Sequence, residues 1–79
     1  MNTAIVFDFD ELARRWQSPL VCRDQSMLDK FSGGVLRAST LAKLDCLGQG
    51  PEGRVRIGRK VCYPKESLVR WMRSRAEFL

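Results

Sequence analysis

The segment formed by residues 54–63 constrains the fold more than any other part of the chain. In its first half Val55 and Ile57 alternate with arginines, and a second run of mainly apolar residues follows after Gly58. Alternation with a period of two on both sides of a glycine is typical of a β-hairpin. Pro64 comes next, and proline is well tolerated where a helix opens, because its missing N–H would have no partner there. We therefore expect a hairpin combined with helices, an α+β fold that is mostly helical.

The length of the hairpin loop decides which side chains share a face. A two-residue loop of Gly58 and Arg59 would place Ile57 opposite Lys60 and mix apolar and basic side chains on one face. A three-residue loop that also includes Lys60 would place Ile57 opposite Val61, which gives one apolar face. We therefore expect the three-residue loop. The other face of the hairpin is then left to Arg54, Arg56 and Cys62.

Helical periodicity is clearest in two segments before the hairpin. In residues 7–16 apolar side chains recur at i, i+3, i+4 and i+7, and Asp8 is suited to cap the helix. In residues 40–47 leucines recur every three residues, which predicts a face packed against a core. Ser39 is a candidate cap for this second helix, and Gly48 suits the left-handed conformation that ends many helices. The leucines expected in the core are Leu41, Leu44 and Leu47.

Residues 17–36, between these two helices, are less regular. Leu20–Cys22 is a short apolar run that fits either a strand or an extended link, and residues 24–31 fit a short helix. A last helix follows Pro64. The whole chain of 79 residues has room for one domain, residues 1–79.

The net charge of +5 is unevenly distributed along the chain. Residues 1–31 carry a net charge of −1, and residues 32–79 carry +6, mostly as arginine. A concentrated basic segment favours a polyanionic partner, and arginine is suited to bidentate contacts with phosphate and guanine. The charge pattern alone therefore leaves two alternatives, nucleic-acid binding and a solvated basic surface.

The chain contains no histidine, which excludes an imidazole base, the usual catalytic triads and any zinc site that needs histidine. Cys22, Cys46 and Cys62 are too far apart for a CxxC motif and are interpreted as small hydrophobic residues in a reducing compartment. We therefore expect no enzymatic activity, no cofactor, no metal and no small-molecule substrate. No apolar run is long enough to cross a membrane, and residues 1–4 lack the basic opening of a signal peptide. We expect a cytoplasmic protein, associated with the nucleoid when bound to DNA.

Four stretches taken in order resemble one family. They are residues 10–13 (Asp-Glu-Leu-Ala), residues 39–48 with Thr-Leu near the start and glycine at the end, residues 54–64, and residues 68–72. Together they resemble the MerR-like winged helix-turn-helix of small phage and mobile-element excisionases and regulators. The resemblance implies a recognition helix in the second stretch and a two-stranded antiparallel wing over about residues 54–63. It also implies that about residues 17–36 are inserted between the first two helices.

The resemblance implies sequence-specific binding to double-stranded DNA, by an excisionase-like directionality factor or a small transcriptional regulator. The recognition helix would enter the major groove, and the wing would lie on the minor groove or the backbone. The candidate DNA-contacting residues are Arg37, Ser39, Thr40, Lys43, Arg54, Arg56, Arg59 and Lys60. Further copies on adjacent sites and a recombinase are the implied protein partners. The alternatives are a DNA-recognition domain like that of a terminase small subunit and a protein-interaction adaptor that keeps the fold without binding DNA.

Overall fold

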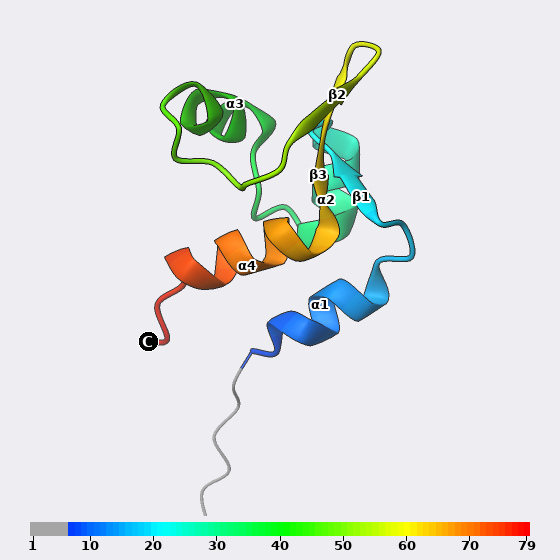
Figure 1. Cartoon of the computed structure of the whole chain (residues 1–79). Coiled ribbons are helices and arrows are strands. Elements are labelled where there is room, and N and C mark those ends of the chain that lie inside the picture. Colours follow the sequence, from blue (N-terminus) through cyan, green and yellow to red (C-terminus); the bar gives the residue numbers. More distant parts are fainter. Residues whose placement is uncertain (1–6) are drawn as a thin grey trace, which may run out of the picture.

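The computed structural model describes residues 7–79, which form four helices and a three-stranded antiparallel sheet in an α+β fold (Figure 1). The elements in chain order are α1 Phe9–Arg15, β1 Leu20–Cys22, α2 Gln25–Ser32, α3 Ala38–Cys46, β2 Val55–Ile57, β3 Lys60–Pro64 and α4 Lys65–Arg75. Residues 1–4, in which we expected no signal peptide, lie outside the described residues. Within residues 7–79, no helix combines the length and the apolar character that crossing a membrane requires.

The first two helices begin at aspartate caps. The Asp8 side chain accepts hydrogen bonds from the backbone N–H groups of the first turn of α1, and Asp24 does the same for α2. Gly33 ends α2 in the left-handed conformation, with φ of 68°, which glycine adopts without steric cost. Both predicted helices are confirmed, with slightly different ends.

The third helix begins and ends earlier than expected. Arg37 is its N-cap residue and makes no side-chain cap hydrogen bond, so Ser39 lies in the first turn and is not the cap. Leu47 is the C-cap residue and is 59% exposed, so the expectation that it faces the core is wrong. The helix ends before it because the N–H of Gln49 donates to the carbonyl of Leu44 at 2.8 Å, which closes a Schellman motif and turns the chain away.

The sheet has the strand order β1–β3–β2, with β3 in the centre. The register of β1 against β3 sets Val21 opposite Tyr63 and Cys22 opposite Cys62. Both β1 and α2 come from residues 17–36, the segment expected as an insert. This segment supplies a large part of the core, because its side chains Val21, Leu28, Phe31 and Leu36 are all buried.

The β2–β3 hairpin has a two-residue loop of Gly58 and Arg59, so the expected three-residue loop is wrong. Ile57 pairs with Lys60, which is the pairing that a two-residue loop produces. Gly58 has φ of 63°, and glycine at the first loop position is the preference of a type II′ turn, whose twist matches that of the strands. Turn chemistry therefore outweighs the matching of apolar side chains. As a result, Ile57 is 57% exposed.

The register also changes the faces of the hairpin. Val55 pairs with Cys62, so these two side chains lie on the same face, whereas the expected register placed them on opposite faces. Arg56 pairs with Val61 and lies on the other face. The Val55 side chain is 44% exposed, so β2 adds little to the core.

One hydrophobic core joins every described element except β2. Its buried side chains are Phe9, Val21, Leu28, Phe31, Leu36, Leu41, Tyr63, Leu68 and Val69. Trp16 and Trp71 are partly buried and pack against this cluster. The indole N–H of Trp16 donates to the carbonyl of Leu20 at 2.9 Å and so fixes the link between α1 and β1.

Candidate nucleic-acid interface

The third helix and the tip of the β2–β3 hairpin lie at one end of the molecule, away from α1 (Figure 1). The structure therefore brings together at this end the residue types that the sequence singled out. All eight candidate side chains are exposed: Arg37, Ser39 and Thr40 at the start of α3, Lys43 in its last turn, and Arg54, Arg56, Arg59 and Lys60 on the hairpin or directly before it.

Asp45 ties α3 to the sheet, a role that no sequence pattern indicated. It is 5% exposed, and its Oδ2 atom accepts hydrogen bonds from the Tyr63 hydroxyl at 2.5 Å and from the Arg23 guanidinium at 2.7 Å. Burial raises the pKa of Tyr63 well above its ordinary value, and the bond to Asp45 acts in the same direction. The phenol therefore remains a donor at neutral pH. This network links the second half of α3 to β3 and to the end of β1.

The other carboxylate oxygen of Asp45 faces the start of the hairpin. In the part of the chain that the structure describes, this Oδ1 atom has no hydrogen-bond partner, and the Arg54 guanidinium lies 4.0 Å away. Gly50 packs so closely against Oδ1 that a Cβ atom added at this position would overlap it. Arg54 therefore stands between a buried negative charge and solvent, with its side chain half exposed.

Lys60 is also paired within the fold. Its ammonium donates to Asp24 at 3.1 Å, and this hydrogen bond holds the pKa of Asp24 below its ordinary value. Asp24 also caps α2, so the ion pair links the hairpin to the start of that helix. Part of the charge of Lys60 is thus compensated before any partner is present.

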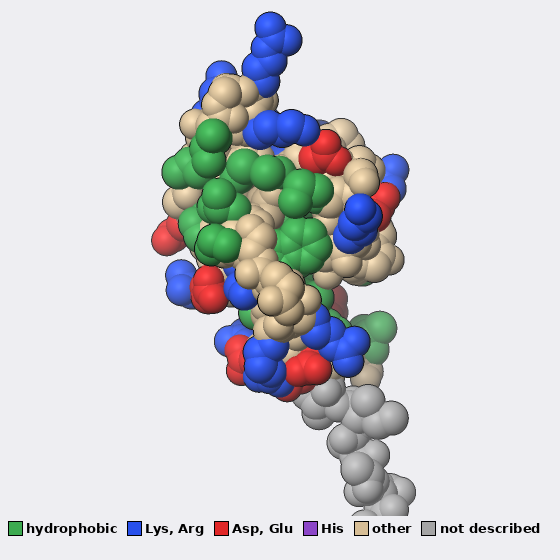
Figure 2. Space-filling view, turned by 90° about the vertical axis from the view of Figure 1, so that its right-hand side faces the viewer, with side chains coloured by type: hydrophobic (Ala, Val, Ile, Leu, Met, Phe, Trp, Pro, Cys, Tyr) green, Lys and Arg blue, Asp and Glu red, His purple; other side chains and the backbone are tan. Residues whose placement is uncertain are grey.

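Four of the candidate cations have no acidic partner among residues 7–79. These are Arg37, Lys43, Arg56 and Arg59. Lys30, Lys65, Arg70 and Arg75 also lack one, but they lie on α2 and α4 and do not belong to the predicted interface. Figure 2 shows basic side chains at the hairpin end, above a group of hydrophobic side chains.

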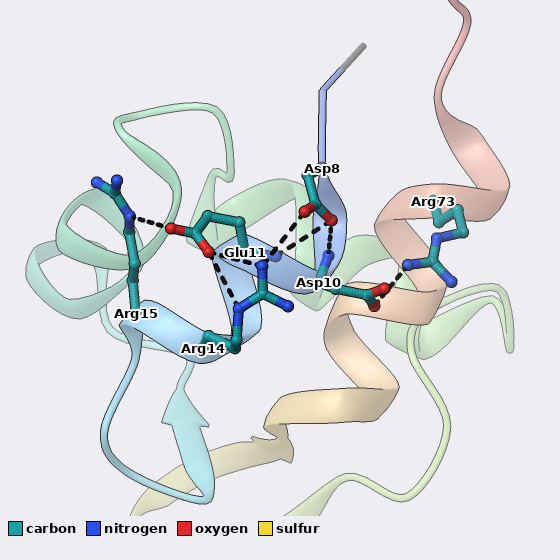
Figure 3. A network of polar contacts seen from close by, with 6 residues as sticks. All are labelled: Asp8, Asp10, Glu11, Arg14, Arg15 and Arg73. Carbon is teal, nitrogen blue, oxygen red and sulfur yellow. Dashed lines mark hydrogen bonds and ion pairs between the residues drawn. The ribbon is translucent and has the colours of Figure 1, made fainter.

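Around α1, at the opposite end of the molecule, three arginines are neutralised by nearby carboxylates. Arg14 binds Glu11 at 2.7 Å, and Arg73 of α4 binds Asp10 at 2.9 Å (Figure 3). Arg15 also pairs with Glu11, at 3.2 Å. Acidic and basic side chains accordingly alternate around α1 (Figure 2). Arg14, Arg15 and Arg73 are therefore compensated by carboxylates, whereas Arg37, Lys43, Arg56 and Arg59 have no acidic partner among the described residues.

Within residues 7–79, no group of three or more His, Cys, Asp or Glu side chains is arranged to hold a metal ion. Comparison with protein-family models, with curated proteins and with solved structures finds no match to this chain. The assignment of a function therefore rests on the geometry of the fold and of its charges.

Proposed function

We propose that the chain is a sequence-specific, double-stranded DNA-binding protein with a winged helix-turn-helix, acting as an excisionase-like directionality factor or a small transcriptional regulator. The observation that carries the proposal is the location of the uncompensated cations. Arg37 is the N-cap residue of α3, Lys43 lies in the last turn of the same helix, and Arg56 and Arg59 lie on a hairpin at the same end. A helix and a hairpin that present unpaired cations at one end of a domain suit two neighbouring surfaces of a duplex.

The second and third helices supply the helix-turn-helix of this proposal. In that motif a short turn, often with glycine, joins two helices, and the second helix places its N-terminal residues at base edges in the major groove. Here α2 ends at Ser32, α3 begins at Ala38, and Gly33 and Gly34 lie between them with positive φ. The first helix of the motif is then α2 and not α1. On this view residues 17–36 belong to the DNA-binding unit itself.

The candidate side chains take distinct roles in this arrangement. Arg37 and Lys43 suit guanine or phosphate, and the hydroxyls of Ser39 and Thr40 suit phosphate oxygens. The β2–β3 hairpin is the wing, and Arg59 in its loop is placed for a narrow minor groove. The three remaining cations of the hairpin region, Arg54, Arg56 and Lys60, are assigned to the DNA backbone. Arg54 and Lys60 already lie near a carboxylate of the protein.

A single domain of this size buries only roughly 600–1,000 Å² on DNA, which limits the affinity of one copy. We therefore propose that several copies bind adjacent sites. Such an array bends DNA when the protein assists a recombinase, or covers a promoter when it acts as a repressor.

The test is binding of the purified chain to a labelled pool of random-sequence duplexes at low and moderate salt, followed by sequencing of the bound fraction. We expect an enriched motif and a log–log dependence of affinity on salt with a slope of about −5, from five or six cations on phosphates. No binding at low salt would refute the proposal. Binding without an enriched motif would refute sequence specificity.

Single charge removals test where the DNA lies. Lys43→Ala and Arg59→Ala should each weaken binding and reduce the salt slope by about 1. Arg15→Ala is the matched control, because it removes one positive charge at the α1 end and its exposed ion pair with Glu11 contributes little to stability. Equal losses from all three variants would show that only net charge matters. Circular dichroism of each variant confirms that the fold is retained.

A further inference from the structure

Two of the three cysteines lie directly opposite each other in the sheet. Cys22 of β1 and Cys62 of β3 are partners in the register, and their Sγ atoms are 2.8 Å apart. Cys46 lies apart from them, exposed on α3. No sequence pattern connects Cys22 with Cys62, because their contact depends on the pairing of two strands that are distant in the sequence.

The backbone hydrogen bonds define the kind of pair that these cysteines form. The N–H of Arg23 donates to the carbonyl of Val61 at 2.7 Å, one step along the ladder from the cysteines. Hydrogen-bonded and non-hydrogen-bonded pairs alternate in an antiparallel ladder, so Cys22 and Cys62 form a non-hydrogen-bonded pair. In such pairs the Cα atoms are roughly 4.5 Å apart and the side chains are closest, which falls in the range of roughly 4.4–6.8 Å that a disulfide requires.

We propose that Cys22 and Cys62 form a thiol–disulfide modification site, which a low-molecular-weight disulfide such as glutathione disulfide converts to a cross-strand disulfide. The inference goes beyond DNA binding and does not depend on it. It rests on the register of β1 against β3 and on the contact between the two sulfur atoms.

The burial of the two cysteines sets the order of the reaction. Cys62 is 2% exposed, and burial raises the pKa of its thiol to about 11, with the hydrogen bond to Cys22 acting in the same direction. Cys22 is only partly buried and is the cysteine that an oxidant reaches first. Its thiolate attacks one sulfur of glutathione disulfide, which forms a mixed disulfide and releases one glutathione.

The second step closes the cross-link. Cys62 loses its proton, and its sulfur attacks the Cys22 sulfur of the mixed disulfide, which displaces the second glutathione. In total, two protein thiols are oxidised and one glutathione disulfide is reduced to two glutathione thiols. Because the sulfurs already lie in contact, the fold needs no rearrangement.

The cross-link would join two parts of the domain that are far apart in sequence. It would hold β1, which leads into α2, against the central strand, at the position where Cys62 also pairs with Val55 of the hairpin. It would also restrict the unfolded chain between residues 22 and 62, which stabilises the folded state.

The experiment uses the purified full chain, treated with excess glutathione disulfide, quenched with acid and alkylated. Intact mass should show the loss of two hydrogens, about 2 Da, at the Cys22–Cys62 pair, while the exposed Cys46 either remains free for alkylation or carries one glutathione. Trypsin should release residues 16–23 linked to residues 61–65. Thermal unfolding monitored by circular dichroism should shift upward by more than about 10 °C.

Cys46→Ser is the matched control and should keep the cross-link. Cys22→Ser should abolish the cross-link and retain the fold, because Cys22 is only partly buried. Cys62→Ala, on the other strand, should also abolish the cross-link. A stable glutathione adduct on Cys22, three thiols that remain free for alkylation, or a link through Cys46 would each overturn the proposal. No DNA is present in these measurements, so their outcome is independent of the proposed function.

Discussion

Removal of the Tyr63 hydroxyl tests whether a polar network holds α3 to the sheet. Tyr63 is fully buried, and its hydroxyl donates to the buried carboxylate of Asp45 at 2.5 Å. Tyr63→Phe removes this hydroxyl and keeps the ring in the core, so no large cavity is created. Asp45 is then left with Arg23 as its hydrogen-bond donor among the described residues.

The expected loss follows from the charge and burial of the acceptor. A hydrogen bond to a charged group contributes about 1.5–3 kcal/mol, and we expect about 2 kcal/mol here. A domain of 79 residues has a total stability of about 4–12 kcal/mol, so the loss is a large fraction of it. At about 4–8 °C per kcal/mol, the melting temperature should fall by about 8–16 °C.

Thermal and urea unfolding, monitored by circular dichroism, measure this loss. Ser74→Ala is the matched control, since it also removes one hydroxyl but one that is exposed and bonded to a local carbonyl, and it should cost less than about 0.5 kcal/mol. A double-mutant cycle with Asp45→Ala should give a coupling energy of about 1 kcal/mol or more. A loss no larger than that of Ser74→Ala, or an additive cycle, would refute the reasoning.

Three further predictions concern titration and backbone geometry. Burial raises the pKa of the Tyr63 phenol, so as the pH rises past about 10 the unfolded chain loses the phenolic proton before the folded chain does, and the free energy of unfolding falls. In urea titrations at several pH values, Tyr63→Phe should remove this part of the pH dependence. An unchanged pH profile in the variant would contradict the prediction. Gly50→Ala should lower the free energy of unfolding by about 1–3 kcal/mol, because the added Cβ overlaps the Asp45 carboxylate; a neutral effect in urea unfolding would show that the carboxylate moves freely. Gly58→Ala should cost about 1–2 kcal/mol in the same assay, because alanine is strained at φ of 63°; no cost would argue against the two-residue loop.

Two features that depend on near neighbours in the sequence were predicted correctly. Asp8 caps α1 because its side chain reaches N–H groups two and three residues away, and Gly48 adopts positive φ directly after the C-cap residue of α3.

Features that depend on packing between distant segments were not predictable in this way. The parity argument for the hairpin assumed that a covering element would bury Val55 and Ile57, but the turn at Gly58 set the register and left both side chains exposed. Asp45 resembled an ordinary surface residue in a helix. Its role appears only when β3 brings Tyr63 against it.

The two contacts that the sequence did not reveal come from adjacent residues of β3. Successive side chains of a strand point to opposite faces, so Cys62 meets Cys22 of β1 while Tyr63 meets Asp45 of α3. A slip of β3 by one residue would exchange the faces and break both contacts at once. The register of this central strand therefore positions α3 relative to the hairpin. In the proposed complex with DNA, the spacing between α3 and the hairpin is then set by residues that need not touch DNA.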